Sequence, residues 1–234
     1  MLEFINFSKT YKGGKQAVKD LNLKIEPGDI YGFIGHNGAG KTTSLKAAVG
    51  IIDFEGGDIL VGGRSIKKDP VACKQITAYI PDNPELYEYL SGIKYLNFIG
   101  DIYGVPADER NRLISKYGEI FELSGDLGSA ISSYSHGMKQ KLAIISALIH
   151  SPKLLILDEP FVGLDPKAAH LLKEVFHEMC EAGTAIFFST HVLEVAEKLC
   201  NKIAIIKNGS LVASGTTDAV RGNSSLEDIF LELN

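Results

Sequence analysis

The chain has 234 residues, of which 45% are hydrophobic and 23% charged, as expected for a globular domain with a buried core. Its formal net charge of −5 argues against nucleic-acid binding. The three cysteines are far apart and form no C-x-x-C pair, so neither a disulfide framework nor a zinc site is indicated. The longest apolar stretch is shorter than the roughly 20 residues of a membrane span, and the N-terminus lacks a secretion leader, so we expect a cytoplasmic protein.

The first 30 residues predict a β-hairpin. Apolar and polar residues alternate in "LEFINFSKTY" and again in "AVKDLNLKI", which is typical of half-exposed strands. The "KGGK" between them supplies a glycine turn.

The next segment predicts a phosphate-binding loop. The apolar "IYGFIG" leads into "GHNGAGKT" and then into a helical pattern, so the match to G-x-x-x-x-G-K-[ST] lies between a strand and a helix. Glycines let the backbone wrap around phosphates with its N–H groups pointing inward, which favours this interpretation over a simple glycine turn. We expect Lys41 to reach the β- and γ-phosphates and Thr42 to hold Mg²⁺. The nucleotide-binding residues predicted here are Gly35, Asn37, Gly38, Ala39, Gly40, Lys41, Thr42 and Thr43.

A helical region interrupts the strands that follow. "GGDILVGG" and "ITAYIP" are short strands, but residues from about 88 to 150 contain three segments with helical spacing and no convincing strand. We therefore expect a helical subdomain, about 88–150, inserted into an α/β core formed by residues 1–87 and 151–234.

Strands and helices alternate again from residue 154. "LLILDE" and "AIFFST" are apolar strands, each followed by a helical pattern, and "KIAIIKNGSLVASG" is a hairpin. Strands buried on both faces and joined by helical crossovers predict an α/β fold with a mostly parallel, doubly wound sheet.

Asp158 and Glu159 end one of these strands, at the edge where α/β sheets present ligand-binding groups. Acidic turns are common after strands, but beside a phosphate loop this pair predicts Asp158 at Mg²⁺ and Glu159 polarising the attacking water. His191 ends another strand, where a lone histidine is often only structural. Because the strands that end at Gly35, Asp158 and His191 should converge on one sheet edge, we expect His191 to contact the γ-phosphate.

The order of these motifs resembles that of the nucleotide-binding subunits of ABC transporters, from Tyr11 to about residue 215. The resemblance implies one P-loop NTPase domain over residues 1–234, with an N-terminal antiparallel β subdomain and the inserted helical subdomain. It implies ATP and Mg²⁺ as cofactors, with Tyr11 stacked on adenine. Tyr11 could instead be a strand-end tyrosine that packs on its neighbours. The "GLDP" loop would contact the opposite subunit, with Asp165 as its polar link.

The segment "YSHGMKQK" takes the place of the family's signature, usually Leu-Ser-Gly-Gly-Gln. Ser135 and Gly137 match it, whereas Tyr134, His136 and Met138 do not. A hydroxyl at the N-cap and a small residue at the helix start favour an anion there. The resemblance implies that this anion is the γ-phosphate of ATP held by a second subunit; the alternative is an ordinary N-capped helix.

A second departure from the family is Asp82, which stands after Pro81 where a glutamine is usual. A carboxylate can meet Mg²⁺ or its water but cannot offer the amide donor of glutamine. The aromatic residues beyond it would either line a docking groove for the membrane partner or pack inside the helical subdomain. They are Tyr87, Tyr89, Tyr95, Phe98 and Tyr103.

The resemblance implies an ATP-hydrolysing subunit that dimerises around ATP, as a homodimer or with a second ABC subunit. With no membrane span of its own, it would drive an integral-membrane permease on a separate chain from the cytoplasmic face, and its motifs favour the bacterial exporter type. Two alternatives are a soluble ABC-type ATPase and an ATP-gated docking module. This sequence shows neither the coiled-coil insertion nor the second cassette of such soluble ATPases, which argues against the first alternative. Glu159 argues against a docking module without turnover.

Overall fold

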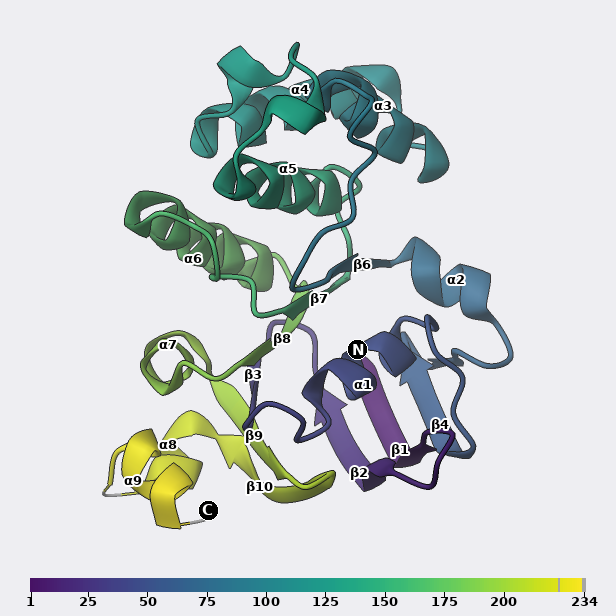
Figure 1. Ribbon diagram of the computed structural model, residues 1–234, viewed down its shortest axis with the longest axis vertical. Helices are drawn as coiled ribbons and strands as arrows, with labels where there is room; N and C mark the ends of the chain where they lie inside the picture. Colours follow the sequence, from purple (N-terminus) through teal and green to yellow (C-terminus); the bar gives the residue numbers. More distant parts are fainter. Residues whose placement is uncertain (223, 233–234) are drawn as a thin grey trace.

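The N-terminal residues form an antiparallel sheet, as the alternating pattern predicts. The computed structural model describes residues 1–222 and 224–232 (Figure 1). The sheet has the order β2-β1-β4-β5, and β1 and β2 form the predicted hairpin. Its strands are β1 (Leu2–Thr10), β2 (Gln16–Ile25), β4 (Gly56–Val61) and β5 (Arg64–Ser65).

A second sheet carries the α/β part of the chain. Its order is β10-β9-β3-β8-β7-β6, and every pairing is parallel except that of β9 with β10. Every residue of β3, β7 and β8 is buried, which explains their unbroken apolar sequences. The strands are β3 (Ile30–Ile34), β6 (Thr77–Ile80), β7 (Leu154–Asp158), β8 (Ala185–Thr190), β9 (Lys202–Lys207) and β10 (Ser210–Thr216).

Helices pack around this sheet and extend from one end of it. α3, α4 and α5 lie between β6 and β7 in the chain and gather at the top of Figure 1, away from the antiparallel sheet. The helices are α1 (Lys41–Ala48), α2 (Pro70–Gln75), α3 (Gly92–Ile102), α4 (Ala107–Ile120), α5 (His136–Leu148), α6 (Pro166–Glu181), α7 (Leu193–Leu199), α8 (Thr217–Arg221) and α9 (Leu226–Glu232), with short 3₁₀ turns at Ser124–Asp126 and Ile131–Ser133.

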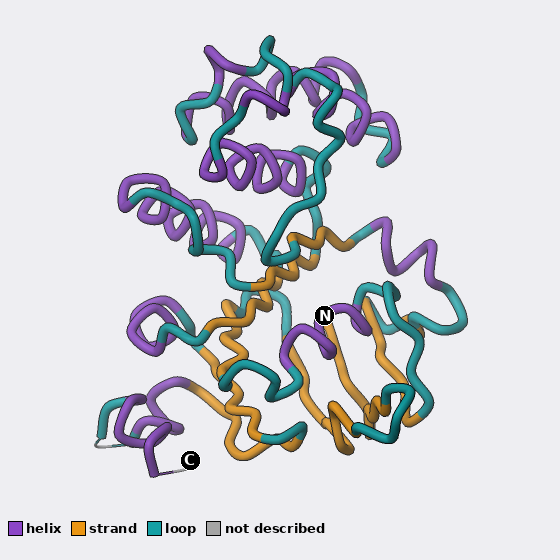
Figure 2. Tube along the Cα trace, viewed as in Figure 1, coloured by secondary structure: helices purple, strands orange, loops and turns teal. Residues whose placement is uncertain are grey.

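The two faces of the parallel sheet belong to different hydrophobic clusters. Phe187 and Phe188 are consecutive residues of β8 and point to opposite faces, because side chains alternate along a strand. Phe187 joins the cluster of the antiparallel sheet, with its ring 6.1 Å from that of Phe4 and 5.3 Å from that of Phe33. Phe188 joins the cluster that includes α5 and α6. The sheet is therefore the layer that ties the two ends of the molecule together, as the strand trace in Figure 2 shows.

These observations confirm the predicted fold class. α2, β5, α8 and α9 were not predicted. α2, β5 and α8 are too short to show a clear period. Among the described residues, no helix combines the length and the apolar character that crossing a bilayer requires.

Candidate functional site

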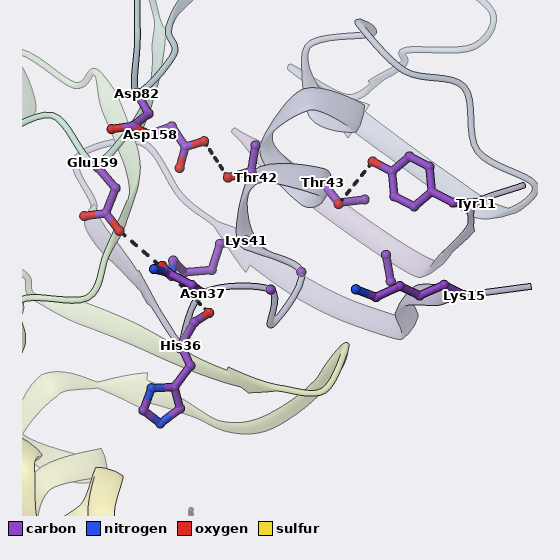
Figure 3. A pocket seen from close by; sticks show the side chains of 13 residues that line it. Tyr11, Lys15, His36, Asn37, Lys41, Thr42, Thr43, Asp82, Asp158 and Glu159 are labelled. Atoms are coloured by element: carbon purple, nitrogen blue, oxygen red, sulfur yellow. Dashed lines mark hydrogen bonds and ion pairs between the residues drawn. The ribbon is translucent and has the colours of Figure 1, made fainter. Parts of the chain in front are cut away.

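A cavity of about 250 Å³ lies where the hairpin, the loop before α1 and the ends of β6 and β7 meet (Figure 3). Its polar and charged lining comes from segments far apart in the sequence, and the parallel sheet brings them to one edge. The lining residues are Tyr11, Lys15, Ala17, His36, Asn37, Gly38, Gly40, Lys41, Thr42, Thr43, Asp82, Asp158 and Glu159.

The loop between β3 and α1 needs its glycines for close packing. A Cβ on Gly40 would lie 2.6 Å from the carbonyl oxygen of Ala17, and Gly40 has a φ of 114°. A Cβ on Gly35 would lie 2.5 Å from the carbonyl oxygen of Ile206. The loop therefore fits tightly against β2 and β9, and α1 begins directly at Lys41 with its N-terminus beside the cavity.

Lys41 is a buried cation held by the loop itself. Its ammonium group donates to the carbonyl oxygen of Gly35 at 2.5 Å and to that of His36 at 3.4 Å, and it lies 3.9 Å from a carboxylate oxygen of Glu159. Burial lowers the pKa of Lys41, while the nearby Glu159 and Asp158 oppose this shift. A phosphate beside the loop would give this ammonium a second anionic partner in addition to Glu159.

Asp158 is oriented through both of its carboxylate oxygens. The Thr42 hydroxyl donates to Oδ2 at 2.6 Å, and the Ser189 hydroxyl donates to Oδ1. Ser189 stands directly across the β7–β8 ladder from Asp158, so the strand register sets this contact. Asp82 follows β6, the neighbour of β7, and lines the same cavity. Carboxylate and hydroxyl oxygens are ligands that Mg²⁺ accepts, together with several waters, so this corner fits a magnesium ion.

Glu159 lines the cavity and pairs with His191, which is not among the described lining residues. The Nδ1 of His191 lies 2.9 Å from Oε1 of Glu159, whose side chain is 12% exposed, whereas that of His191 is 55% exposed. Glu159 has a φ of 49°, which turns the chain sharply after β7, and its N–H donates to the hydroxyl of Ser189 at 3.1 Å. The expected convergence of strand ends is observed, because β3, β8 and β7 are parallel neighbours and end at one edge of the sheet. At this edge Glu159 lies 3.9 Å from Lys41 and 2.9 Å from His191, and Asp158 contacts Thr42.

The opposite end of the cavity belongs to the β1–β2 hairpin. The Tyr11 hydroxyl lies 3.3 Å from the hydroxyl oxygen of Thr43, and the tyrosine is 42% exposed. Lys15 also lines the cavity and was not predicted (Figure 3). The only signal for Lys15 in the sequence is its position next to the hairpin glycines.

The start of α5, in "YSHGMKQK", lies outside the cavity that the same chain forms. Ser135 is the N-cap of α5, and its hydroxyl oxygen accepts from the N–H of Met138 at 3.3 Å, as predicted. A Cβ on Gly137 would lie 3.1 Å from the carbonyl oxygen of Gly163. Neither Ser135 nor Gly137 is among the described residues that line the cavity. One chain therefore does not bring this segment to its own phosphate loop.

The "GLDP" loop packs beside this helix start. A Cβ on Gly163 would lie 2.6 Å from the imidazole ring of His136, so the ring sits against the glycine. Asp165 caps α6 by accepting from the N–H of Ala168 at 2.8 Å, and it pairs with Lys141 at 3.0 Å. The Ala168 N–H and the Lys141 ammonium hold the pKa of Asp165 below its usual value.

The aromatic series divides between core and surface. Tyr95 is buried, and Tyr103 stacks on His150 with ring centroids 3.6 Å apart. Tyr87, Tyr89 and Phe98 are exposed and adjoin one another, with the Tyr87 ring 6.0 Å from Tyr89 and 5.6 Å from Phe98. We call these three residues the aromatic cluster. A second cavity of about 680 Å³ is lined by residues 79–86, Tyr95 and others. It lies beside the aromatic cluster, since the ring of Tyr87 is 6.1 Å from that of Tyr95.

The loop, its buried lysine and the carboxylates at neighbouring strand ends define a P-loop ATPase. The ABC transporter family matches residues 18–162, and the chain belongs to this family as an ATP-binding subunit with ATPase activity. It is 34% identical over 222 residues to the ABC-type transporter ATP-binding protein EcsA of Bacillus subtilis (strain 168), covering 93% of this chain and 90% of that protein.

Solved structures of ABC subunits share the fold over nearly the whole chain. The structure described as the ATP binding subunit of an ABC transporter has 35% identity and a TM-score of 0.95, covering 100% of this chain and 99% of that one. CbiO1 of Clostridium perfringens is described as part of the ABC transporter complex CbiONQ. It has 25% identity and a TM-score of 0.81, and the match covers 99% of this chain and 95% of that one. The family and the fold implied by the motif order are thus confirmed.

Proposed function

We propose that this ATPase subunit works at the cytoplasmic face of a membrane and drives a permease carried on a separate chain, in the direction of export. The CbiO1 relative is described as part of a transporter complex, which supports a multi-subunit arrangement. The export direction rests on the resemblance of "PDNPELYEYLSG" and "YSHGMKQK" to exporter-type cassettes. We assign residues 1–234 to one ABC ATPase domain, with an α/β core from 1–87 and 151–234 and a helical subdomain over about 88–150.

ATP lies along the cavity in this proposal. Adenine stacks on the half-exposed ring of Tyr11, and the phosphates extend to the loop and to Lys41. The glycines support this pose because they hold the loop against β2 and β9 with α1 beginning at the cavity. The phosphate-binding residues are Gly35, Asn37, Gly38, Ala39, Gly40, Lys41, Thr42 and Thr43.

Thr42, Asp158 and Asp82 would hold Mg²⁺. The ion would neutralise charge on the β- and γ-phosphates when bound. The Thr42 hydroxyl and the Asp158 carboxylate are already in contact at 2.6 Å, and Ser189 fixes the other oxygen of Asp158. Asp82 provides a carboxylate where an amide is usual in the family, so in this chain that position acts as an acceptor only.

Glu159 is the base for hydrolysis in this proposal. Its carboxylate orients the attacking water and accepts a proton from it as the water oxygen bonds to the γ-phosphorus and the bond to the β-phosphate oxygen breaks. His191 holds the Glu159 carboxylate through their 2.9 Å contact. In this proposal it also meets the γ-phosphate. The products are ADP and inorganic phosphate.

A second subunit completes the site. Ser135 and Gly137 begin α5 outside the cavity of their own chain, so they are free to meet the γ-phosphate held by a partner. The partner is a second copy or another ABC subunit. The aromatic cluster and the cavity beside it form the docking surface for the permease, because exposed aromatic side chains are enriched at protein interfaces.

The observation that carries this proposal is the convergence of Lys41, Asp158, Glu159 and His191 at one sheet edge. Replacing Glu159 with Gln tests it, because the amide keeps the shape of the side chain but cannot accept the proton. We expect ATP binding to persist while steady-state hydrolysis falls by roughly 10²- to 10⁴-fold. Wild-type turnover in this variant would remove Glu159 from the catalytic role.

A further inference from the structure

The C-terminal helix α9 touches the phosphate loop. The ring of Phe230 lies 4.5 Å from the ring of His36, the second residue of the loop. The His36 carbonyl oxygen accepts from the N–H of Ala39 at 3.1 Å and from the ammonium of Lys41 at 3.4 Å. In Figure 3 the His36 ring points away from Lys41, toward the ribbon of the C-terminal region. Phe230 therefore packs on the residue whose backbone helps to shape the phosphate loop.

The same helix is anchored on α7, the helix that follows His191. Leu226 is fully buried in the core cluster. Its N–H donates to a carboxylate oxygen of Glu197 in α7 at 3.4 Å, and Arg221 of α8 pairs with Glu197 at 3.1 Å. α7 begins two residues after His191, at Leu193. α9 thus contacts both the loop that holds the phosphates and the helix that follows the histidine at the γ-phosphate side.

We propose that Phe230 is a positioning residue that orders the phosphate loop through His36, and that nucleotide binding in turn orders α9. The inference depends on ATP occupying the loop. Coupling between two sites is reciprocal: if a docked α9 favours the loop conformation that binds phosphate, bound nucleotide must stabilise the docked α9 by the same factor. An aromatic pair at this spacing contributes enough to change an equilibrium by roughly 2- to 10-fold.

Two neighbouring substitutions separate this role from a general effect on stability. Ile229 and Phe230 are both half-buried and pack against the same core cluster. Phe230→Ala also removes the ring contact with His36, so Ile229→Ala is its matched control. Phe230→Tyr keeps the ring. We expect Phe230→Ala to weaken binding of a non-hydrolysable ATP analogue by roughly 2- to 10-fold and to speed hydrogen exchange of the loop amides at 36–40. Ile229→Ala and Phe230→Tyr should leave both measurements near wild type.

The reciprocal effect is measured at α9. Adding the ATP analogue to the wild-type protein should slow hydrogen exchange of the amides at 226–232, and His36→Ala, a change at an exposed side chain, should abolish this added protection. The inference is overturned if α9 exchanges at the same rate with and without nucleotide in a protein that binds it. It is also overturned if Phe230→Ala and Ile229→Ala give the same loop exchange. A wild-type chain that binds no ATP would instead contradict the proposed nucleotide site itself.

Discussion

Replacing Lys41 with Ala removes a buried cation from the loop that we propose to hold the phosphates. Lys41 is 6% exposed, and its ammonium lies within hydrogen-bonding distance of two loop carbonyls. Two unit charges 4 Å apart interact by about 4 kcal/mol at an effective dielectric constant of 20. The phosphates lose part of this attraction to desolvation when they bind. We expect a net loss of about 2–4 kcal/mol, which is roughly a 30- to 700-fold rise in the Kd for ATP.

The assay is equilibrium binding of ATP in the Glu159→Gln background, where turnover does not consume the ligand. Lys46→Ala is the matched control, because Lys46 lies in the last turn of the same helix and is not among the described residues that line the nucleotide cavity. It should leave the affinity unchanged. An affinity of the Lys41→Ala variant within twofold of wild type would refute the placement of the phosphates at this loop.

Two further changes test the ends of the site and the core beneath it. Tyr11→Ala should weaken ATP binding by about 1–3 kcal/mol if the ring stacks on adenine. Tyr11→Phe should bind ATP nearly as well as wild type, and Tyr11→Ala should bind tripolyphosphate nearly as well as wild type. Equal losses of affinity for ATP and for tripolyphosphate in Tyr11→Ala would contradict stacking. Phe187→Ala should lower the free energy of unfolding by about 3–5 kcal/mol in a denaturant titration, because the side chain is fully buried and packs against the rings of Phe4, Tyr31 and Phe33. Val212→Ala, at an exposed position, should stay within about 0.5 kcal/mol, and equal effects of the two would show that the shared sheet layer is not the core we describe.

Local patterns in the sequence predicted those parts of the site that depend on neighbouring residues. The phosphate loop follows from a strand, a glycine-rich turn and a helix in direct succession. The N-cap role of Ser135 follows in the same way, because a cap bonds to an N–H three residues ahead. Neither feature depends on how distant strands pair.

Contacts set by strand register or by the chain's C-terminal path were not predictable in this way. Ser189 orients Asp158 only because β7 and β8 pair in the observed register, which no local pattern specifies. The Phe230–His36 contact joins the last helix to a loop near the start of the chain. α8 does carry a start signal, since Thr216 caps it through the N–H of Ala219, but five residues are too few for a helical period to be recognised.

The start of α5 decides whether the active unit is one chain or two. Because Ser135 and Gly137 do not line the cavity of their own chain, a single chain should bind ATP without completing the site. We therefore expect the protein to be mainly monomeric without nucleotide. Ser135→Arg is the cleaner probe of this segment, since any side chain at Gly137 also meets the Gly163 carbonyl of the same chain at 3.1 Å. His136→Gly and Met138→Gln restore the usual family residues and should be tolerated.

Mixing Ser135→Arg protein with Lys41→Ala protein tests the two-chain site directly. Each variant alone should hydrolyse almost no ATP, because every composite site in its dimer carries one lesion. In a mixed dimer, one site combines the intact phosphate loop of the first chain with the intact Ser135 of the second, while the other site collects both lesions. ATPase activity should therefore reappear in the mixture, and the Ser135→Arg chain should still bind ATP. If cross-linking shows that mixed dimers form and the mixture remains as inactive as either variant, Ser135 does not serve the nucleotide of the opposite subunit.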